Sequence, residues 1–127
     1  MPITPAFGAA GTLCARSTKS LVKQRYQVAK LAFPDDADLA RSLGVHRSAV
    51  VRWKRGDAPA RENWEQLVGL DTAISLLENF LEPSTIPKWL RGINAHLGDR
   101  RPIDVIRLGR LSEVIAAIEV EKAGAFS

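Results

Sequence analysis

The feature that most restricts the fold is the stretch 38–56, which reads as two short helices joined by a tight turn. Leu39 and Leu43 are four residues apart and share one face of the first helix. Val50 and Trp53 are three residues apart and share one face of the second helix. Both helices therefore have an apolar side that must pack against something else.

The turn between these helices is predicted at Gly44, because glycine tolerates the left-handed backbone that ends a helix. Ala40, four residues earlier, is small enough to let two helices cross closely. Turn, small residue and apolar pairs together are typical of the helix-turn-helix motif, whose second helix lies in the DNA major groove.

The side chains expected to contact DNA are those at the start and along the outer face of the second helix: His46, Arg47, Ser48, Val51, Arg52, Lys54 and Arg55. His46 is placed to cap this helix. Arg47 and Arg52 can each bond two acceptors of guanine, and Ser48 can bond a base or a phosphate. Lys54 and Arg55, at the helix exit, suit phosphates. The alternative is that these cations only solvate a surface helix.

Charge is distributed unevenly along the chain. The net charge is +4, but residues 1–61 carry +7 and residues 62–127 carry −3. A basic half beside an acidic half predicts one surface for a polyanion and a second surface for a different partner.

Several classes of protein are disfavoured. A single cysteine, Cys14, leaves no internal disulfide framework, which favours a cytoplasmic protein. The apolar segment near the start has no Lys or Arg before it, so a signal peptide is poorly supported, and we expect residues 1–16 to be a flexible tail. No window approaches the roughly 18–20 apolar residues of a membrane span.

The rest of the chain has helical periodicity and no β-type alternation, so we predict an all-α fold. A first helix is expected over 17–33, ended by Pro34, and a long amphipathic helix over 60–82. Since helix-turn-helix proteins usually bind DNA as dimers, this long helix is the expected dimerisation element. Its candidate interface residues are Trp64, Leu67, Ile74, Leu77, Phe80 and Leu81.

Beyond Pro83 the predicted helices are short: 87–91, 93–97, 102–108 and 111–121. Helices of this length need a shared core or a partner to be stable.

The C-terminal segment carries a recognisable series: Trp89-Leu90, Leu97-Gly98, Arg101-Pro102-Ile103-Asp104-Val105-Ile106, Gly109, Glu113-Val114 and a closing amphipathic helix. This series resembles the toxin-binding domain of the Xre/MbcA/ParS antitoxin family, in which a helix-turn-helix also comes first. The two parts cover roughly residues 20–127. One departure is the basic Asp99-Arg100-Arg101, where a further glycine would be usual.

The resemblance implies an architecture and a function. It divides the chain into the tail 1–16, a helix-turn-helix bundle 17–59, a connecting helix 60–83 and a toxin-binding domain 84–127. It implies an antitoxin that binds and neutralises a RES-domain, NAD-degrading toxin and represses their shared operon by binding operator DNA. The implied toxin contacts are Trp89, Arg100, Arg101, Lys122, Ala123, Gly124, Ala125, Phe126 and Ser127. The segment 121–127 is expected to be a tail that obstructs the toxin's active-site opening.

Catalysis is not expected. The sequence has no glycine-rich phosphate loop, paired-histidine metal spacing or nucleophile constellation, so we expect no catalytic residue, metal or cofactor. The residues leave one alternative to an antitoxin: a stand-alone helix-turn-helix transcriptional regulator whose C-terminal helices serve dimerisation or bind a small effector.

Overall fold

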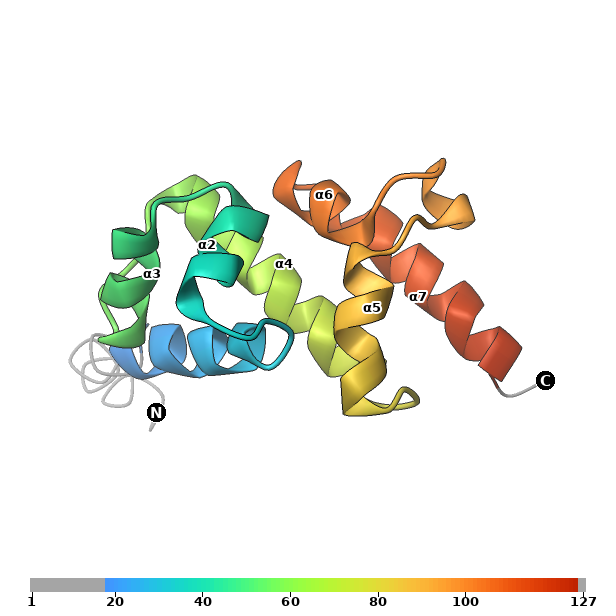
Figure 1. Cartoon of the computed structure of the whole chain (residues 1–127), viewed down its shortest axis with the longest axis horizontal. Helices are drawn as coiled ribbons and strands as arrows, with labels where there is room; N and C mark the ends of the chain where they lie inside the picture. Colours follow the sequence, from blue (N-terminus) through green and yellow to red (C-terminus); the bar gives the residue numbers. More distant parts are fainter. Residues whose placement is uncertain (1–17, 126–127) are drawn as a thin grey trace, which may run out of the picture.

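The protein is all-α, as predicted. The computed structural model describes residues 18–125, and this part contains helices and no strand (Figure 1). The predicted tail 1–16, Phe126 and Ser127 lie outside the described residues. In Figure 1 the N-terminal helices lie on one side of a long diagonal helix, and the C-terminal helices lie on the other.

The N-terminal side comprises a helix over residues 18–30, α2 (Asp36–Leu43) and α3 (Arg47–Lys54). The carboxylate of Asp35 caps α2 by accepting a hydrogen bond from the backbone N–H of Asp38 at 2.8 Å. Gly44 ends α2 with φ of 69°, the left-handed conformation expected there. The four apolar residues that defined the two helix faces are buried: Leu39, Leu43, Val50 and Trp53.

The long helix, α4 (Arg61–Leu77), is shared by both sides of the molecule. Its side chains Leu67, Leu70, Ile74 and Leu77 are completely buried, and they belong to one continuous hydrophobic core that includes residues of α2, α3, α6 and α7. The helix ends at Leu77 rather than near residue 82, and the chain turns over residues 78–80.

The C-terminal side consists of the short elements η1 (Pro83–Thr85), α5 (Ile86–Arg91), η2 (Ala95–Leu97) and α6 (Pro102–Arg107), followed by the longer α7 (Leu111–Ala125). The helix predicted over 93–97 is only a single 3-10 turn. The last helix continues to Ala125, four residues beyond its predicted end. The contacts of α6 and α7 with α4 supply the shared core that helices of this length require.

Two charged contacts tie the N-terminal helices to the rest. Arg25, on the first helix, forms an ion pair with Asp71 of α4 at 2.7 Å, and its guanidinium lies 5.5 Å from the centre of the Trp64 ring. Asp38 of α2 forms an ion pair with Arg91 of α5. The guanidinium of Arg91 also stacks over the ring of Phe33 at 4.8 Å.

Gly69 allows α6 to approach α4 closely. It is buried in the middle of α4, and a Cβ atom at this position would lie 3.2 Å from Cγ2 of Ile106 and 3.8 Å from Cδ1 of Leu111. The glycine lowers the helix stability by about 1 kcal/mol relative to alanine, but it allows α6 to pack closely against α4.

We expect Gly69→Leu to lower the free energy of unfolding by about 2 kcal/mol. Overpacking a core costs up to about 3 kcal/mol, and the gain in helix propensity returns about 1 kcal/mol. Ala116→Leu, at an exposed position of α7, is the control and should change stability by less than about 0.5 kcal/mol. Urea unfolding measures both. Equal stability of Gly69→Leu and the parent would contradict the close approach of α6.

Candidate functional site

The start of α3 is fixed by His46, which caps the helix as predicted. Nδ1 of His46 accepts a hydrogen bond from the backbone N–H of Ser48 at 3.1 Å and lies 2.8 Å from Oγ of Ser48. The apolar side of α3, formed by Ala49, Val50 and Trp53, is buried. These two constraints determine which side of α3 faces solvent.

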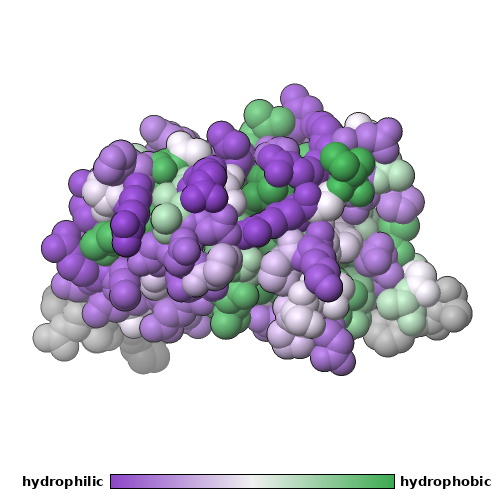
Figure 2. Space-filling view, in the orientation of Figure 1, coloured by the Kyte–Doolittle hydropathy of each residue, from purple (hydrophilic) through white to green (hydrophobic). Residues whose placement is uncertain are grey.

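The solvent-facing side of α3 carries every residue named above as a candidate DNA contact. All seven are exposed: His46, Arg47, Ser48, Val51, Arg52, Lys54 and Arg55. Among the described residues, Arg47, Arg52 and Lys54 form no ion pair, whereas Arg55 contacts the carboxylate of Asp57 at 3.2 Å. In Figure 2, hydrophilic side chains dominate the visible face over α2 and α3. The structure thus gathers the predicted set on one cationic surface.

Two candidate toxin-contacting residues, Arg100 and Arg101, already form hydrogen bonds with other residues of the same chain. Arg100 donates from Nε to the carbonyl of Leu97 at 2.7 Å and from Nη2 to Glu113 at 2.7 Å, so it fastens the η2 loop to α7. Arg101 makes two hydrogen bonds to Asp104, at 2.8 and 3.1 Å. These bonds and the negative charge of Asp104 raise the pKa of Arg101 above its ordinary value. Arg100 therefore has a structural role in this loop, whereas Arg101 forms an exposed ion pair.

Residues 121–125, which were expected to belong to a tail, form the last part of α7, so this helix ends later than predicted. The last buried residue of α7 is Ile118, and every residue over 119–125 is exposed, including the predicted contacts Lys122, Ala123, Gly124 and Ala125. The last turns of α7 therefore project beyond the core (Figure 1). Trp89, on α5, is partly buried against the core.

The predicted dimerisation face of α4 is narrower than expected. Leu67, Ile74 and Leu77 are completely buried in the chain's own core and offer no surface to a second copy. Trp64 is only partly buried, as are Phe80 and Leu81, which lie beyond the end of α4. Amphipathic periodicity located the buried side of α4 correctly, but it could not say that the packing partner is the same chain.

Sequence reasoning missed the residues that join the two sides of the molecule. The ion pairs Arg25–Asp71 and Asp38–Arg91 connect positions 46 and 53 residues apart. No local spacing rule relates positions so distant, so no signal in the single sequence could have paired them. Within residues 18–125 there is no group of three side chains able to hold a metal ion, and no helix has the length and apolarity to cross a membrane.

Comparison with known proteins defines the class. No protein-family model and no solved structure matches the chain. It is 32% identical over 89 residues to a protein of Mycobacterium tuberculosis described as a probable mycobacterial cidal antitoxin, and the aligned region covers 70% of this chain and 76% of the relative. The class is therefore that of the antitoxins of toxin–antitoxin systems. Within this class, the chain belongs to the mycobacterial cidal antitoxin family.

A hydrogen bond also links the first helix to α2, where the hydroxyl of Tyr26 donates to Asp36. Burial raises the pKa of Tyr26 to about 12, and the hydrogen bond to Asp36 and the charge of Asp36 act in the same direction. In the unfolded chain the pKa of Tyr26 is near 10. The protonated hydroxyl of Tyr26 therefore stabilises the folded state fully below pH 10, and this contribution is lost as the pH rises towards 12.

Tyr26 is the only tyrosine of the chain, so the ultraviolet absorbance of tyrosinate reports on this residue alone. We expect a titration midpoint near 12 in the folded protein and near 10 in denaturant. Asp36→Asn should lower the folded midpoint, because it removes the negative charge while burial is retained. A midpoint near 10 in the folded protein would contradict this packing of Tyr26.

Proposed function

We propose that the protein neutralises a RES-domain toxin by direct binding and represses their shared operon by binding operator DNA through α3. Family membership carries the antitoxin role, and it favours this function over that of a stand-alone regulator. The DNA-binding part is supported by the cationic surface of α3, where Arg47, Arg52 and Lys54 form no ion pair within residues 18–125.

The geometry of α3 supports docking in the major groove. Gly44 ends α2 and His46 caps α3, and in helix–turn–helix motifs the start of the second helix contacts base edges. Arg47 and Ser48 lie at that start. Arg52 lies on the exposed face beside Val51, which is 41% exposed and can contact a thymine methyl group.

A protein partner is supported by the end of α7. All seven residues over 119–125 are exposed, although most helical stability in proteins comes from packing. Three of the large hydrophobic residues with exposed side chains also lie in the C-terminal part: Ile93, Leu108 and Val120. Docking on a toxin would bury apolar surface that the isolated chain leaves in water.

For DNA binding, we expect Arg47→Ala and Arg52→Ala each to weaken operator binding by about 1–3 kcal/mol and to relax specificity at one base pair. Lys54→Ala should weaken binding to all sequences alike and reduce the salt slope by about 0.9. Arg61→Ala is the matched control, since Arg61 is exposed on α4. Fluorescence anisotropy with duplex DNA at several salt concentrations measures these effects. Unchanged operator affinity of Arg47→Ala would refute this docking.

For toxin binding, we expect Lys122→Glu to weaken the complex with the toxin by at least about 2 kcal/mol, roughly thirtyfold in Kd, because it reverses a charge at the end of α7. Lys88→Glu, an equal change at an exposed position of α5, is the control. Calorimetry and rescue of growth on co-expression with a RES-domain protein encoded beside this gene provide the readouts. Full rescue and unchanged affinity with Lys122→Glu would place the interface elsewhere. Failure of the parent chain to rescue growth would refute neutralisation of that toxin.

A further inference from the structure

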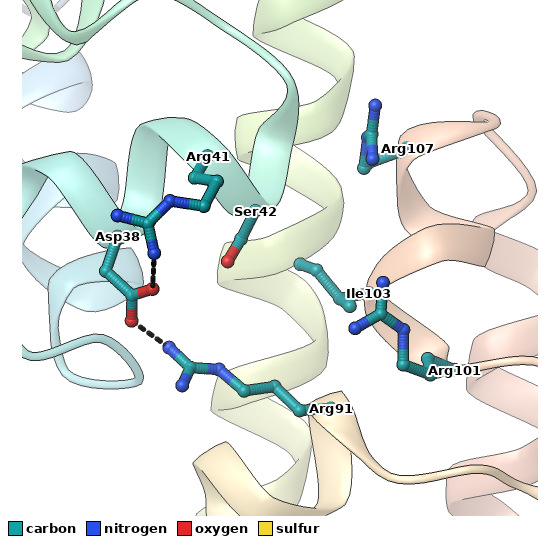
Figure 3. A pocket seen from close by; sticks show the side chains of 7 residues that line it. All are labelled: Asp38, Arg41, Ser42, Arg91, Arg101, Ile103 and Arg107. Carbon is teal, nitrogen blue, oxygen red and sulfur yellow. Dashed lines mark hydrogen bonds and ion pairs between the residues drawn. The ribbon is translucent and has the colours of Figure 1, made fainter.

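A pocket of about 260 Å³ lies where the two sides of the molecule meet. Residues of α2 form one wall, and residues of α5, α6 and the segment before α6 form the other (Figure 3). The lining residues are Asp38, Arg41, Ser42, Arg91, Arg101, Ile103 and Arg107. None of these residues belongs to the candidate DNA-contacting set, and Arg101 alone belongs to the candidate toxin-contacting set.

The pocket carries an excess of positive charge. Four arginines line it together with one carboxylate, that of Asp38. Asp38 is shared by two of them: it contacts Arg41 at 3.3 Å and also pairs with Arg91. Both contacts are visible in Figure 3. A single carboxylate cannot neutralise four arginines.

The other two arginines do not restore the balance. Arg101 pairs with Asp104, which is outside the pocket lining. Arg107 forms no ion pair among the described residues, and its guanidinium lies against Gly44, where a Cβ atom would come within 2.4 Å of Nη2. Even when Asp104 is counted, the group has two more positive than negative charges.

The chemistry of these residues selects the ligand. Arginine offers a planar set of N–H donors that matches the oxygens of a phosphate group, and its charge is permanent. Ser42 adds a hydroxyl donor beside them, and Ile103 provides an apolar surface. At about 260 Å³ the pocket is smaller than the roughly 300–1,000 Å³ of sites that enclose a drug-sized ligand, so it suits a single anionic group.

We propose that this pocket binds a phosphate group, supplied either by a free phosphate-bearing molecule or by the backbone of nucleic acid. The bound anion would relieve the repulsion among the arginines and would bridge α2 to α5 and α6, on opposite sides of the molecule. The site is separate from the outer face of α3, and the proposal does not depend on toxin binding.

The test uses the full chain and inorganic phosphate, with sodium chloride added to hold the ionic strength constant. We expect the melting temperature to rise with phosphate concentration and to saturate, because a ligand that binds only the folded state stabilises it by mass action. Arg107→Ala and Arg41→Ala should each raise the Kd for phosphate about tenfold to a hundredfold. Both side chains are exposed, so the folded state should survive their removal.

Arg110→Ala is the control, since Arg110 lies three residues after Arg107, is exposed and does not line the pocket. It should bind phosphate as the parent does. Arg107→Lys separates charge from geometry: it keeps the charge but loses the planar donor set, so it should still weaken binding. The absence of stabilisation in the parent chain, or equal stabilisation of the parent, Arg41→Ala and Arg107→Ala, would overturn the proposal.

The source of the phosphate is distinguished by competition. If nucleic acid supplies it, a DNA duplex should displace inorganic phosphate, and Arg107→Ala should weaken duplex binding equally for all sequences. If a free molecule supplies it, phosphate should bind equally well with and without the duplex. Arg47→Ala tests the proposed operator docking separately from the pocket. This substitution should leave phosphate binding unchanged whichever source of phosphate is correct.

Discussion

The rest of the structure depends on α4, which is buried between the N-terminal and the C-terminal helices. α2, α3, α5 and α6 have six to eight residues each, and helices this short are unstable on their own. They are stabilised because their apolar residues join one core, to which α4 contributes Leu67, Leu70, Ile74 and Leu77. Gly69 lets α6 come close enough to complete that core. The surface of α3 and the projecting end of α7 are thus presented by a single packed body.

Local signals explain what the sequence could predict. The turn at Gly44, the cap at His46 and the buried side chains of Leu39 and Trp53 each follow from rules that act within a few residues. The all-α fold and the approximate positions of the helices follow from periodicity in the same way. The outward face of α3 was also predictable, because it is the complement of the buried face.

The predictions that were wrong concern features that local sequence rules do not determine. Periodicity shows that one side of α4 is buried, but Leu67 and Ile74 would show the same spacing whether they packed against the same chain or a second copy. The resemblance implied a tail over 121–127, yet Ala123 and Ala125 are compatible with helix, and α7 continues through them. The pairing of Asp38 with Arg91 exists only in three dimensions, so the arginine-lined pocket was invisible in the sequence.

In the structure, many charges of the acidic half of the chain are used in ion pairs within the chain itself. Several carboxylates of the acidic half are already engaged: Asp71 holds Arg25 of the first helix, Asp104 holds Arg101, and Glu113 holds Arg100. The acidic residues therefore position elements of the chain as much as they form a negative surface. Under the proposed function, recognition of a toxin would therefore draw on the exposed residues of the C-terminal side, including the end of α7, rather than on a uniformly negative surface. The basic half differs, because the cations of α3 remain unpaired within residues 18–125 and are free to meet a polyanion.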